Sequence, residues 1–254
     1  MNEQFVVVSD IHGQAELLER VINRYGDDVS YILNGDMIDR GPDSRGIFDI
    51  AADIGANIIL GNHEWVLLGA MNDPNPERRA AWQETWFGIG SMRYENQALQ
   101  SYGIGSRLSP EEAASELKET MLRLGHLSLL ENAKIYNETP GVLVVHSGLP
   151  SDIRMERIHE RLDSYLVMHQ ANQYVDEPEE LFSAKLATSY KAPRDLSKLL
   201  VTGHIHYRRP LSERLYGGTS IKPTRAYLAS CLDLGDPLYV YESWSGQIAA
   251  FEQP

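Results

Sequence analysis

The stretch LNGDMIDRGPDSR, residues 33–45, places charged side chains of both signs directly after an apolar run. It holds three carboxylates and two arginines: Asp36, Asp39, Asp43, Arg40 and Arg45. Carboxylate oxygens bind cations, and the planar guanidinium of arginine suits phosphate oxygens. A solvated loop is the alternative, but the first carboxylate follows the strand-like residues YIL too closely to favour it.

Residues that commonly bind metals recur at the ends of five apolar runs. They are Asp10 and His12 in VVSDIHG, Asp36 in LNGD, Asn62 and His63 in LGNHE, His146 in VVHSG, and His204 and His206 in VTGHIH. A single histidine beside an apolar strand is usually a hydrogen-bonded core residue. Five runs that all end in this way favour one shared metal site.

The ligand types narrow the choice of metal. Carboxylate, imidazole and amide groups without a thiolate fit Mn²⁺, Fe or Zn²⁺ better than a cysteine-rich zinc site or a calcium site. So many ligands exceed what one ion with an open position takes. We therefore expect two divalent ions bridged by one carboxylate, with Mn²⁺ first and Fe or Zn²⁺ as alternatives. Such a pair clamps a phosphoryl group and generates a hydroxide nucleophile.

The elements that must position these residues alternate between strand and helix. Apolar runs rich in β-branched residues predict strands at 4–9, 29–34 and 56–61, and helical spacing predicts helices within 10–26, 44–55 and 63–71. Short connections between them imply parallel strands joined by right-handed crossovers. The chemistry is then expected at the carboxyl ends of the strands.

The rest of the chain predicts a second set of strands. Residues 72–131 are mostly polar and helical, and we expect them to form an inserted helical cap. Two strands follow with a hairpin-like break at Pro140 and Gly141, then a helical stretch at 151–190, then strands at 199–207, 225–230, 237–243 and 247–252. The expected fold is a single α/β domain over 1–254, a two-sheet β-sandwich flanked by helices.

Composition limits the possible partners. A formal net charge of −13 over 254 residues argues against a stable nucleic-acid partner or an anionic membrane. The one cysteine, Cys231, excludes an intramolecular disulfide, and no apolar run is long enough to cross a bilayer. We expect a cytoplasmic protein whose metal ions supply the local positive charge that attracts phosphate.

Five motifs in order, SDIHG, GDMIDRG, GNHE, HSG and GHIH, resemble the calcineurin-like metallophosphoesterase superfamily. GDMIDRG with GNHE resembles its phosphoprotein-phosphatase branch, which includes bacterial and phage serine/threonine phosphatases and the symmetrical diadenosine tetraphosphate hydrolases. The motifs span residues 9–206.

The resemblance implies a role for each motif residue. One ion would be held by Asp10, His12 and His206 and the other by Asn62, His146 and His204, with Asp36 as the bridge. His63 would protonate the leaving group, Asp39 would orient His63, and Arg40 would hold phosphate oxygens. Substrate phosphate would therefore meet Arg40, Asn62 and His63.

The resemblance also implies the reaction. The expected activity is metal-dependent hydrolysis of phosphomonoesters, like that of a phosphoserine/phosphothreonine protein phosphatase, by in-line attack of a metal-bridged hydroxide. The alternative is hydrolysis of diadenosine tetraphosphate or another nucleotide phosphodiester. A third reading, a non-catalytic phosphate- or metal-binding regulator, has the least support because no ligand position is substituted.

Two departures from the protein-phosphatase pattern bear on the substrate. GHIH supplies two histidines where that branch commonly has one, and Leu60 stands where it usually has an arginine. A second phosphate-binding arginine has no clear match; the candidates are Arg154, Arg157 and Arg161.

Other residues have simpler explanations. Asp43 is expected to cap a helix and Arg45 to be solvated. Histidines outside the motifs, His126, His159 and His169, are expected in surface or packing roles. The aromatic residues of the insertion are expected mainly in its core: Trp82, Trp86, Phe87, Tyr94 and Tyr102. Cys231 is expected to be a buried apolar residue.

Overall fold

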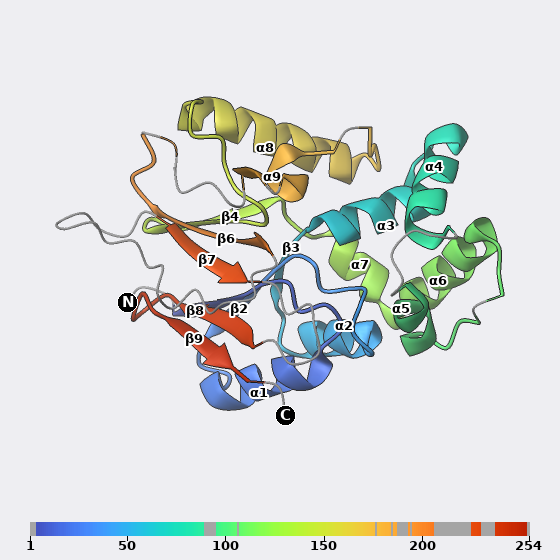
Figure 1. Ribbon diagram of the computed structural model, residues 1–254, viewed down its shortest axis with the longest axis horizontal. Helices are drawn as coiled ribbons and strands as arrows, with labels where there is room; N and C mark the ends of the chain where they lie inside the picture. The colour runs from blue at the N-terminus through green and yellow to red at the C-terminus, as the bar shows by residue number, and fades with distance from the viewer. Residues whose placement is uncertain are drawn as a thin grey trace.

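Two β-sheets lie face to face in the computed structural model, with helices on their outer sides (Figure 1). The structure describes residues 4–88, 95–105, 107–175, 177–183, 185–186, 193, 195–205, 225–229 and 237–252. The expected α/β fold, a two-sheet sandwich flanked by helices, is confirmed.

The first sheet contains the alternating start of the chain. Its strands are β1 (Phe5–Val8), β2 (Ser30–Asn34), β3 (Asn57–Ile59), β8 (Leu238–Glu242) and β9 (Ile248–Phe251), in the order β3-β2-β1-β8-β9. The first three strands are parallel, as predicted, and α1 (Ala15–Tyr25) and α2 (Ser44–Asp53) connect them. The last two run antiparallel and close the far side of the sheet.

The second sheet has the order β4-β5-β6-β7, from β4 (Tyr136–Glu138), β5 (Val142–Val145), β6 (Leu199–Ile205) and β7 (Arg225–Ala229). β4 and β5 pair antiparallel across Pro140 and Gly141, so the predicted hairpin is present. β5, β6 and β7 are parallel. The chain between β5 and β6 forms α8 (Met155–Gln170) and the short α9 (Glu179–Phe182).

Alternation along β1 shows how the layers pack. Phe5 and Val7 face the second sheet, where they join Val142, Val144 and other residues in one apolar cluster. Val6 and Val8 face the opposite way and belong to the cluster that includes the helices. Because successive strand side chains point to opposite faces, four buried residues serve two separate interfaces.

The segment 72–131 holds a group of helices beside the first sheet. They follow α3 (Asn62–Asn72) and are α4 (Pro76–Phe87), α5 (Glu95–Ser101), α6 (Pro110–Leu124) and α7 (His126–Glu131). Figure 1 shows α4, α5 and α6 together at the end of the molecule away from β4 and β9. That this segment acts as a cap stays a prediction.

The aromatic side chains of this segment are mostly packed inward. Trp86 and Tyr102 are buried, Phe87 packs against the core, and the indole of Trp82 donates a hydrogen bond to the Tyr174 carbonyl at 2.9 Å. Tyr94 lies outside the described residues, as does Cys231. The packing role expected for the described members is confirmed.

Local capping follows the sequence prediction at α2. Asp43 accepts a hydrogen bond from the Gly46 N–H at 2.8 Å and so satisfies one of the free donors at the start of the helix. Arg45 pairs with Asp49 one turn along, 3.4 Å apart, and both side chains are about half exposed. A pair of this kind contributes only a few tenths of a kcal/mol, roughly 0.3–0.5.

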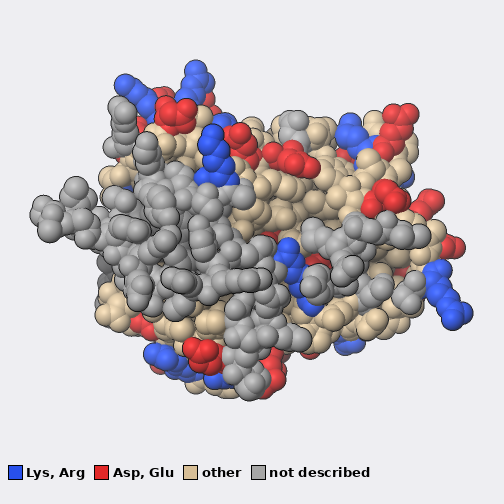
Figure 2. All heavy atoms as spheres, in the orientation of Figure 1, with Lys and Arg blue, Asp and Glu red and all other residues tan. Residues whose placement is uncertain are grey.

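The surface carries charges of both signs. In Figure 2 the described acidic and basic side chains are interspersed and lie mainly along the rims, while much of the described surface between them is uncharged. Attraction for an anionic substrate is therefore expected to come from local groups at a site. No helix among the described residues is long and apolar enough to span a bilayer.

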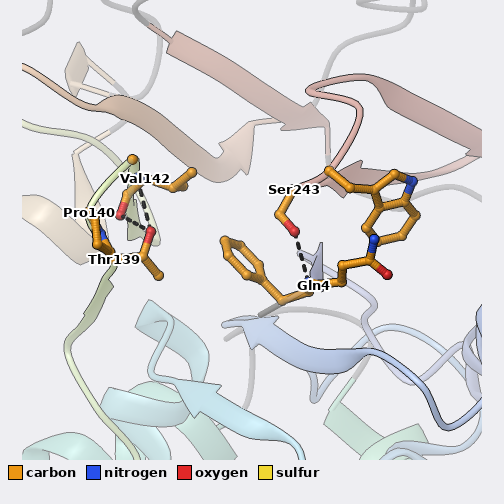
Figure 3. A pocket seen from close by; sticks show the side chains of 8 residues that line it. Gln4, Thr139, Pro140, Val142 and Ser243 are labelled. Atoms are coloured by element: carbon orange, nitrogen blue, oxygen red, sulfur yellow. Dashed lines mark hydrogen bonds between the residues drawn. The ribbon is translucent and has the colours of Figure 1, made fainter. Parts of the chain in front are cut away.

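A cavity of 480 Å³ opens where β1 and β5 begin (Figure 3). It is lined by Gln4, Phe5, Thr139, Pro140, Gly141, Val142, Ser243 and Trp244. None of these side chains ionises near neutral pH. The predicted metal-binding residues follow the carboxyl ends of β1 and β5, so this cavity is separate from them.

Candidate metal centre

The predicted metal-binding side chains that the structure describes converge at the carboxyl ends of the parallel strands. The side chains form two groups, and within each group the ligand atoms all lie within 4.8 Å of one another. The groups are His12 with Asp36 and His63, and Asp36 with His146 and His204. Asp36 belongs to both groups, as a bridging carboxylate must. His206 lies outside the described residues.

Asp36 sits at the centre of this cluster. Its Oδ2 lies 3.8 Å from His12 Nε2, 3.9 Å from His63 Nε2 and 3.4 Å from His146 Nε2. Burial disfavours the charge of Asp36, but the attraction of His146 and His63 prevails and holds its pKa well below the ordinary value. The central carboxylate is therefore ionised at neutral pH.

Backbone carbonyls fix the orientation of two histidine rings. The Nδ1–H of His12 donates to the Ile38 carbonyl at 2.9 Å, and that of His146 donates to the Asn34 carbonyl at 2.8 Å. Each bond leaves Nε2 directed toward Asp36. Metal-binding histidines commonly have this arrangement, in which an outer hydrogen bond selects the tautomer.

The pKa values of His12 and His146 are shifted in opposite directions. Burial lowers the pKa of His12 well below its ordinary value, so this ring is neutral and available as a ligand. Burial also lowers the pKa of His146, but attraction to Asp36 outweighs it and raises the pKa to about 10. The cluster thus favours a positive charge at His146, and a divalent cation bound there would supply that charge in place of the proton.

Asn62 completes the second group. Its Oδ1 lies 2.9 Å from His204 Nδ1 and 3.3 Å from His146 Nε2, and those two nitrogens are 3.2 Å apart. The Asn62 amide can present either end here: its nitrogen would donate to His204, His146 and Asp36, and its oxygen would serve as a ligand to a bound cation. The residues present therefore fit a pair of divalent ions, and the assignment of individual ligands stays a prediction.

Asp10 is fully buried and hydrogen-bonded to the backbone of His204 near the end of β6. Its carboxylate accepts hydrogen bonds from the backbone N–H of His204 at 2.9 Å and from the Ser9 hydroxyl. Gly203 lies so close that a Cβ there would collide with Ser9 and Asp10. Glycine at 203 thus allows the end of β6 to pack closely against Ser9 and Asp10.

The cluster is built on strained backbone. Six site residues that are not glycine have left-handed φ values: Asp10 (54°), His12 (45°), Asp36 (53°), Asp39 (69°), Arg40 (68°) and His204 (70°). Each costs on the order of 1–3 kcal/mol and persists only where neighbouring contacts dictate it. Such strain commonly marks functional sites.

His63 and Asp39 form a close pair beside the cluster. His63 Nδ1 donates to Asp39 Oδ2 at 2.6 Å, and both side chains are nearly fully buried. Burial lowers the pKa of His63, but the attraction of Asp36 and the hydrogen bond to Asp39 raise it overall. The raised pKa favours the protonated ring, which can donate a proton from Nε2.

Arg40 reaches the same space from the turn after β2. Its Nη1 lies 3.4 Å from His12 Nε2, and its side chain is only partly buried. The guanidinium is permanently charged and offers several donors in a fixed plane. A phosphate group bound at the cluster would meet it.

Glu64 is a structural member of the site that the sequence analysis did not assign. Its fully buried carboxylate accepts hydrogen bonds from the N–H groups of Asp36 (2.8 Å), Met37 (2.8 Å), Ile38 (3.2 Å) and Gly61 (2.9 Å). It thereby fixes the loop that carries the bridging residue. Its position three residues after Gly61 at a helix start resembles half of a capping box, which was the available signal.

The candidates for a second phosphate-binding arginine have other partners. Arg157 pairs with Glu160 at 2.6 Å, and Arg161 lies 3.1 Å from Glu179 and 3.2 Å from Glu180. Arg154 precedes α8 as its N-terminal boundary residue. The contact of Arg157 thus lies within α8, and the contacts of Arg161 join α8 to α9. None of these contacts involves a residue of the cluster.

A family model matches most of the chain. The family model described as "Calcineurin-like phosphoesterase" matches residues 4–208. A zinc-dependent endopolyphosphatase of Saccharomyces cerevisiae is 32% identical over 81 residues, which cover 30% of this chain and 25% of that protein. The chain therefore matches about a quarter of that relative's length.

Two solved structures share the fold. One is described as a "putative diadenosine tetraphosphatase" and has a TM-score of 0.57 at 17% identity, covering 100% of this chain and 95% of that one. The other is a protein serine/threonine phosphatase from Saccharomyces cerevisiae, with a TM-score of 0.53 at 14% identity and coverage of 100% and 81%. At these identities the likeness concerns the fold alone.

Proposed function

The chain belongs to the calcineurin-like phosphoesterase family, and from that premise we propose that it hydrolyses phosphomonoesters, with phosphoserine or phosphothreonine proteins as the substrate class. The observation that carries the proposal is the cluster around Asp36, bordered by the His63–Asp39 pair and by Arg40. It combines metal ligands, a proton donor and a phosphate-binding cation in one place.

We assign the metal ligands as the motifs imply. Asp10, His12 and His206 would hold one ion, Asn62, His146 and His204 the other, and Asp36 both. When bound, two divalent ions neutralise phosphate charge and make a coordinated water acidic enough to attack at neutral pH. His63 also lies in the first group of ligand atoms, but the motif assigns it to the leaving group, and we leave it out of both sets.

The side chains around the cluster divide the remaining work. Arg40 binds non-bridging phosphate oxygens and orients the ester. His63 Nε2–H donates its proton to the departing alkoxide oxygen, because a serine or threonine alkoxide is too basic to leave unprotonated. Asp39 keeps the proton of Nδ1 in place, so that Nε2 presents the proton that moves.

A second candidate is hydrolysis of dinucleoside polyphosphates. It is favoured by the second histidine of GHIH, a feature of the wider family rather than of its protein phosphatases. The aromatic residues of the insertion give it less support, because Trp82, Trp86 and Tyr102 are engaged in packing. The partial match to an endopolyphosphatase adds inorganic polyphosphate to the substrates worth testing.

The test is a parallel hydrolysis panel on metal-stripped protein reloaded with Mn²⁺. The substrates are p-nitrophenyl phosphate, its bis ester, a phosphothreonine peptide, diadenosine tetraphosphate and polyphosphate. The proposal predicts preference for the monoester and the peptide. Two ADP from diadenosine tetraphosphate with little peptide hydrolysis would establish the second candidate instead.

Matched arginine variants sharpen this panel. Arg40→Ala should raise KM for the preferred substrate by roughly 10- to 100-fold, as expected when a charge-assisted contact worth about 1.5–3 kcal/mol is lost. Arg45→Ala removes a cation five residues away that pairs with Asp49 at the surface, and it should leave KM unchanged. Equal KM values in the two variants would remove the phosphate-binding role of Arg40.

Complete inactivity of the wild-type protein on all these substrates, with both ions bound, would instead support a non-catalytic phosphate- or metal-binding regulator.

A further inference from the structure

Helix α5 of the insertion packs beside α2 (Figure 1). Ala98 and Leu99 are buried in the main core, and the Ser101 hydroxyl accepts a hydrogen bond from the Arg45 N–H at 3.1 Å. These contacts fix α5 against the first turn of α2. The insertion therefore touches the segment that connects the bridging carboxylate to α2.

The turn at Arg40 has an unfavourable conformation. Asp39 and Arg40 have φ values of 69° and 68°, and the Gly41 N–H bonds back to the Asp39 carbonyl at 2.8 Å. On one side the loop of His12 and Gly13 lies against Gly41 so closely that neither glycine could carry a Cβ. A turn of two consecutive left-handed residues that are not glycine needs support on its other side as well.

Gln97 of α5 supplies a contact on that side. With its amide nitrogen directed at the turn, it donates to the Arg40 carbonyl at 2.5 Å and to the Gly41 carbonyl at 3.3 Å. This orientation is the one that gives the amide a partner, because both groups facing it are acceptors. The side chain itself is exposed, so it contributes little to the core.

We propose that Gln97 is a positioning residue that holds the Arg40 turn in the conformation that binds the substrate phosphate. The inference rests on the proposed function, because it requires Arg40 to bind phosphate. It gives the insertion a part in the site: α5 braces one side of the turn, and the His12–Gly13 loop braces the other. The ligand it serves is the phosphate dianion of a monoester.

The experiment combines four variants with two readouts. Gln97→Leu removes the donor, and Gln100→Leu makes the same change three residues along the same helix, at another exposed position. Arg40→Ala and the Arg40→Ala/Gln97→Leu double variant complete a cycle. KM and kcat are measured with p-nitrophenyl phosphate, and the affinity for inorganic phosphate is measured by calorimetry on Mn²⁺-loaded protein.

We expect Gln97→Leu to raise KM and the phosphate Kd by about three- to tenfold, the loss typical of one neutral hydrogen bond. kcat should stay within about twofold, since the contact serves ground state and transition state alike. Gln100→Leu should change neither constant. In the Arg40→Ala background, Gln97→Leu should have no further effect, because its action passes through Arg40.

Two results overturn the inference while leaving the proposed function intact. Unchanged KM and phosphate Kd in Gln97→Leu, with both raised in Arg40→Ala, would show that the turn does not need the amide. An equal loss from Gln97→Leu in both backgrounds would show that Gln97 acts elsewhere. If Arg40→Ala itself changes neither constant, the phosphate-binding role fails and the inference fails with it.

Discussion

His63 and His126 are both buried histidines that hydrogen-bond to an aspartate, but their second ring nitrogens face different surroundings. His63 Nδ1 bonds to Asp39 at 2.6 Å, and its Nε2 faces Asp36 across 3.9 Å. His126 Nε2 bonds to Asp49 at 3.0 Å, and its Nδ1 accepts from the Tyr102 hydroxyl at 3.0 Å. One ring has a nitrogen directed into the site, whereas both nitrogens of the other are bonded.

The pKa values of the two rings are also shifted in opposite directions. Burial lowers the pKa of both rings, but Asp36 and Asp39 together raise the pKa of His63 overall. For His126 burial prevails over half-exposed Asp49 and the pKa stays below its ordinary value. A histidine–aspartate pair is therefore not by itself a sign of catalysis. The surroundings of the second nitrogen, together with nearby carboxylates, decide whether the ring carries a usable proton.

The largest expected difference between the two rings is in turnover. His63→Ala should lower kcat for a phosphothreonine peptide by about 10² to 10⁴, the range for a positioned general acid. The loss should be smaller for p-nitrophenyl phosphate, whose leaving group needs little protonation. Metal content should not change.

His126→Ala is the control, and its folded fraction should keep its kcat. Equal losses for both substrates in His63→Ala would remove the general-acid role. Loss of one ion in that variant would instead make His63 a ligand.

Replacing the two aspartates should give a smaller difference in kcat than replacing the two histidines. Asp39→Asn keeps the shape of the side chain but removes the charge that stabilises protonated His63, and kcat should fall by roughly 10- to 100-fold. Asp49→Asn makes the same change at the other pair and should leave kcat within about twofold. Steady-state kinetics of both variants at one pH make the comparison. A matching loss in Asp49→Asn would mean that the second pair also serves the reaction.

The smallest expected effect concerns stability and its pH dependence. His126→Gln should cost about 1–3 kcal/mol at pH 8, since the hydrogen bonds of the ring to buried Tyr102 and half-exposed Asp49 are lost. The folded pKa of His126 is depressed, so the unfolded chain binds its proton first as the pH falls below about 6.5. The unfolding free energy of the wild type therefore falls through His126 as the pH drops below about 6.5, and above that pH His126 causes no such loss.

Urea unfolding at pH 8 and pH 5.5 measures this effect. The gap in unfolding free energy between wild type and His126→Gln should narrow at the lower pH, because only the wild type bears the cost of protonating His126. A gap that widens on acidification would show that the folded pKa of His126 is raised instead.

The same comparison shows what the sequence could predict. The strands of both sheets and the cluster around Asp36 were predictable, because each ligand follows an apolar run rich in β-branched residues and parallel strands bring those ends together. The His126 pair was not, since Asp49 lies 77 residues away and outside any strand end. Its expected packing role was right, but its bonding could not be read from spacing.

Two residues that contact the backbone of the site, Glu64 and Gln97, were also not predicted from the sequence. Glu64 binds backbone N–H groups of a loop 26 to 28 residues earlier, and a carboxylate at a helix start does not by itself indicate such distant partners. Gln97 lies in a polar helix, and its contact with the Arg40 turn depends on how α5 packs against α2. Both contacts serve backbone groups, which carry no residue-specific signal.

We propose that Asp36 and the surrounding histidines hold two divalent ions. The direct measurement is the number of Mn²⁺ ions bound per chain, from calorimetry and elemental analysis, in wild type, Asp36→Asn and Asp49→Asn. We predict two ions in wild type and in Asp49→Asn, and weakened binding of both ions in Asp36→Asn, since the shared ligand loses its charge. Asp36→Asn that binds Mn²⁺ with wild-type stoichiometry and affinity would contradict a bridging role for Asp36.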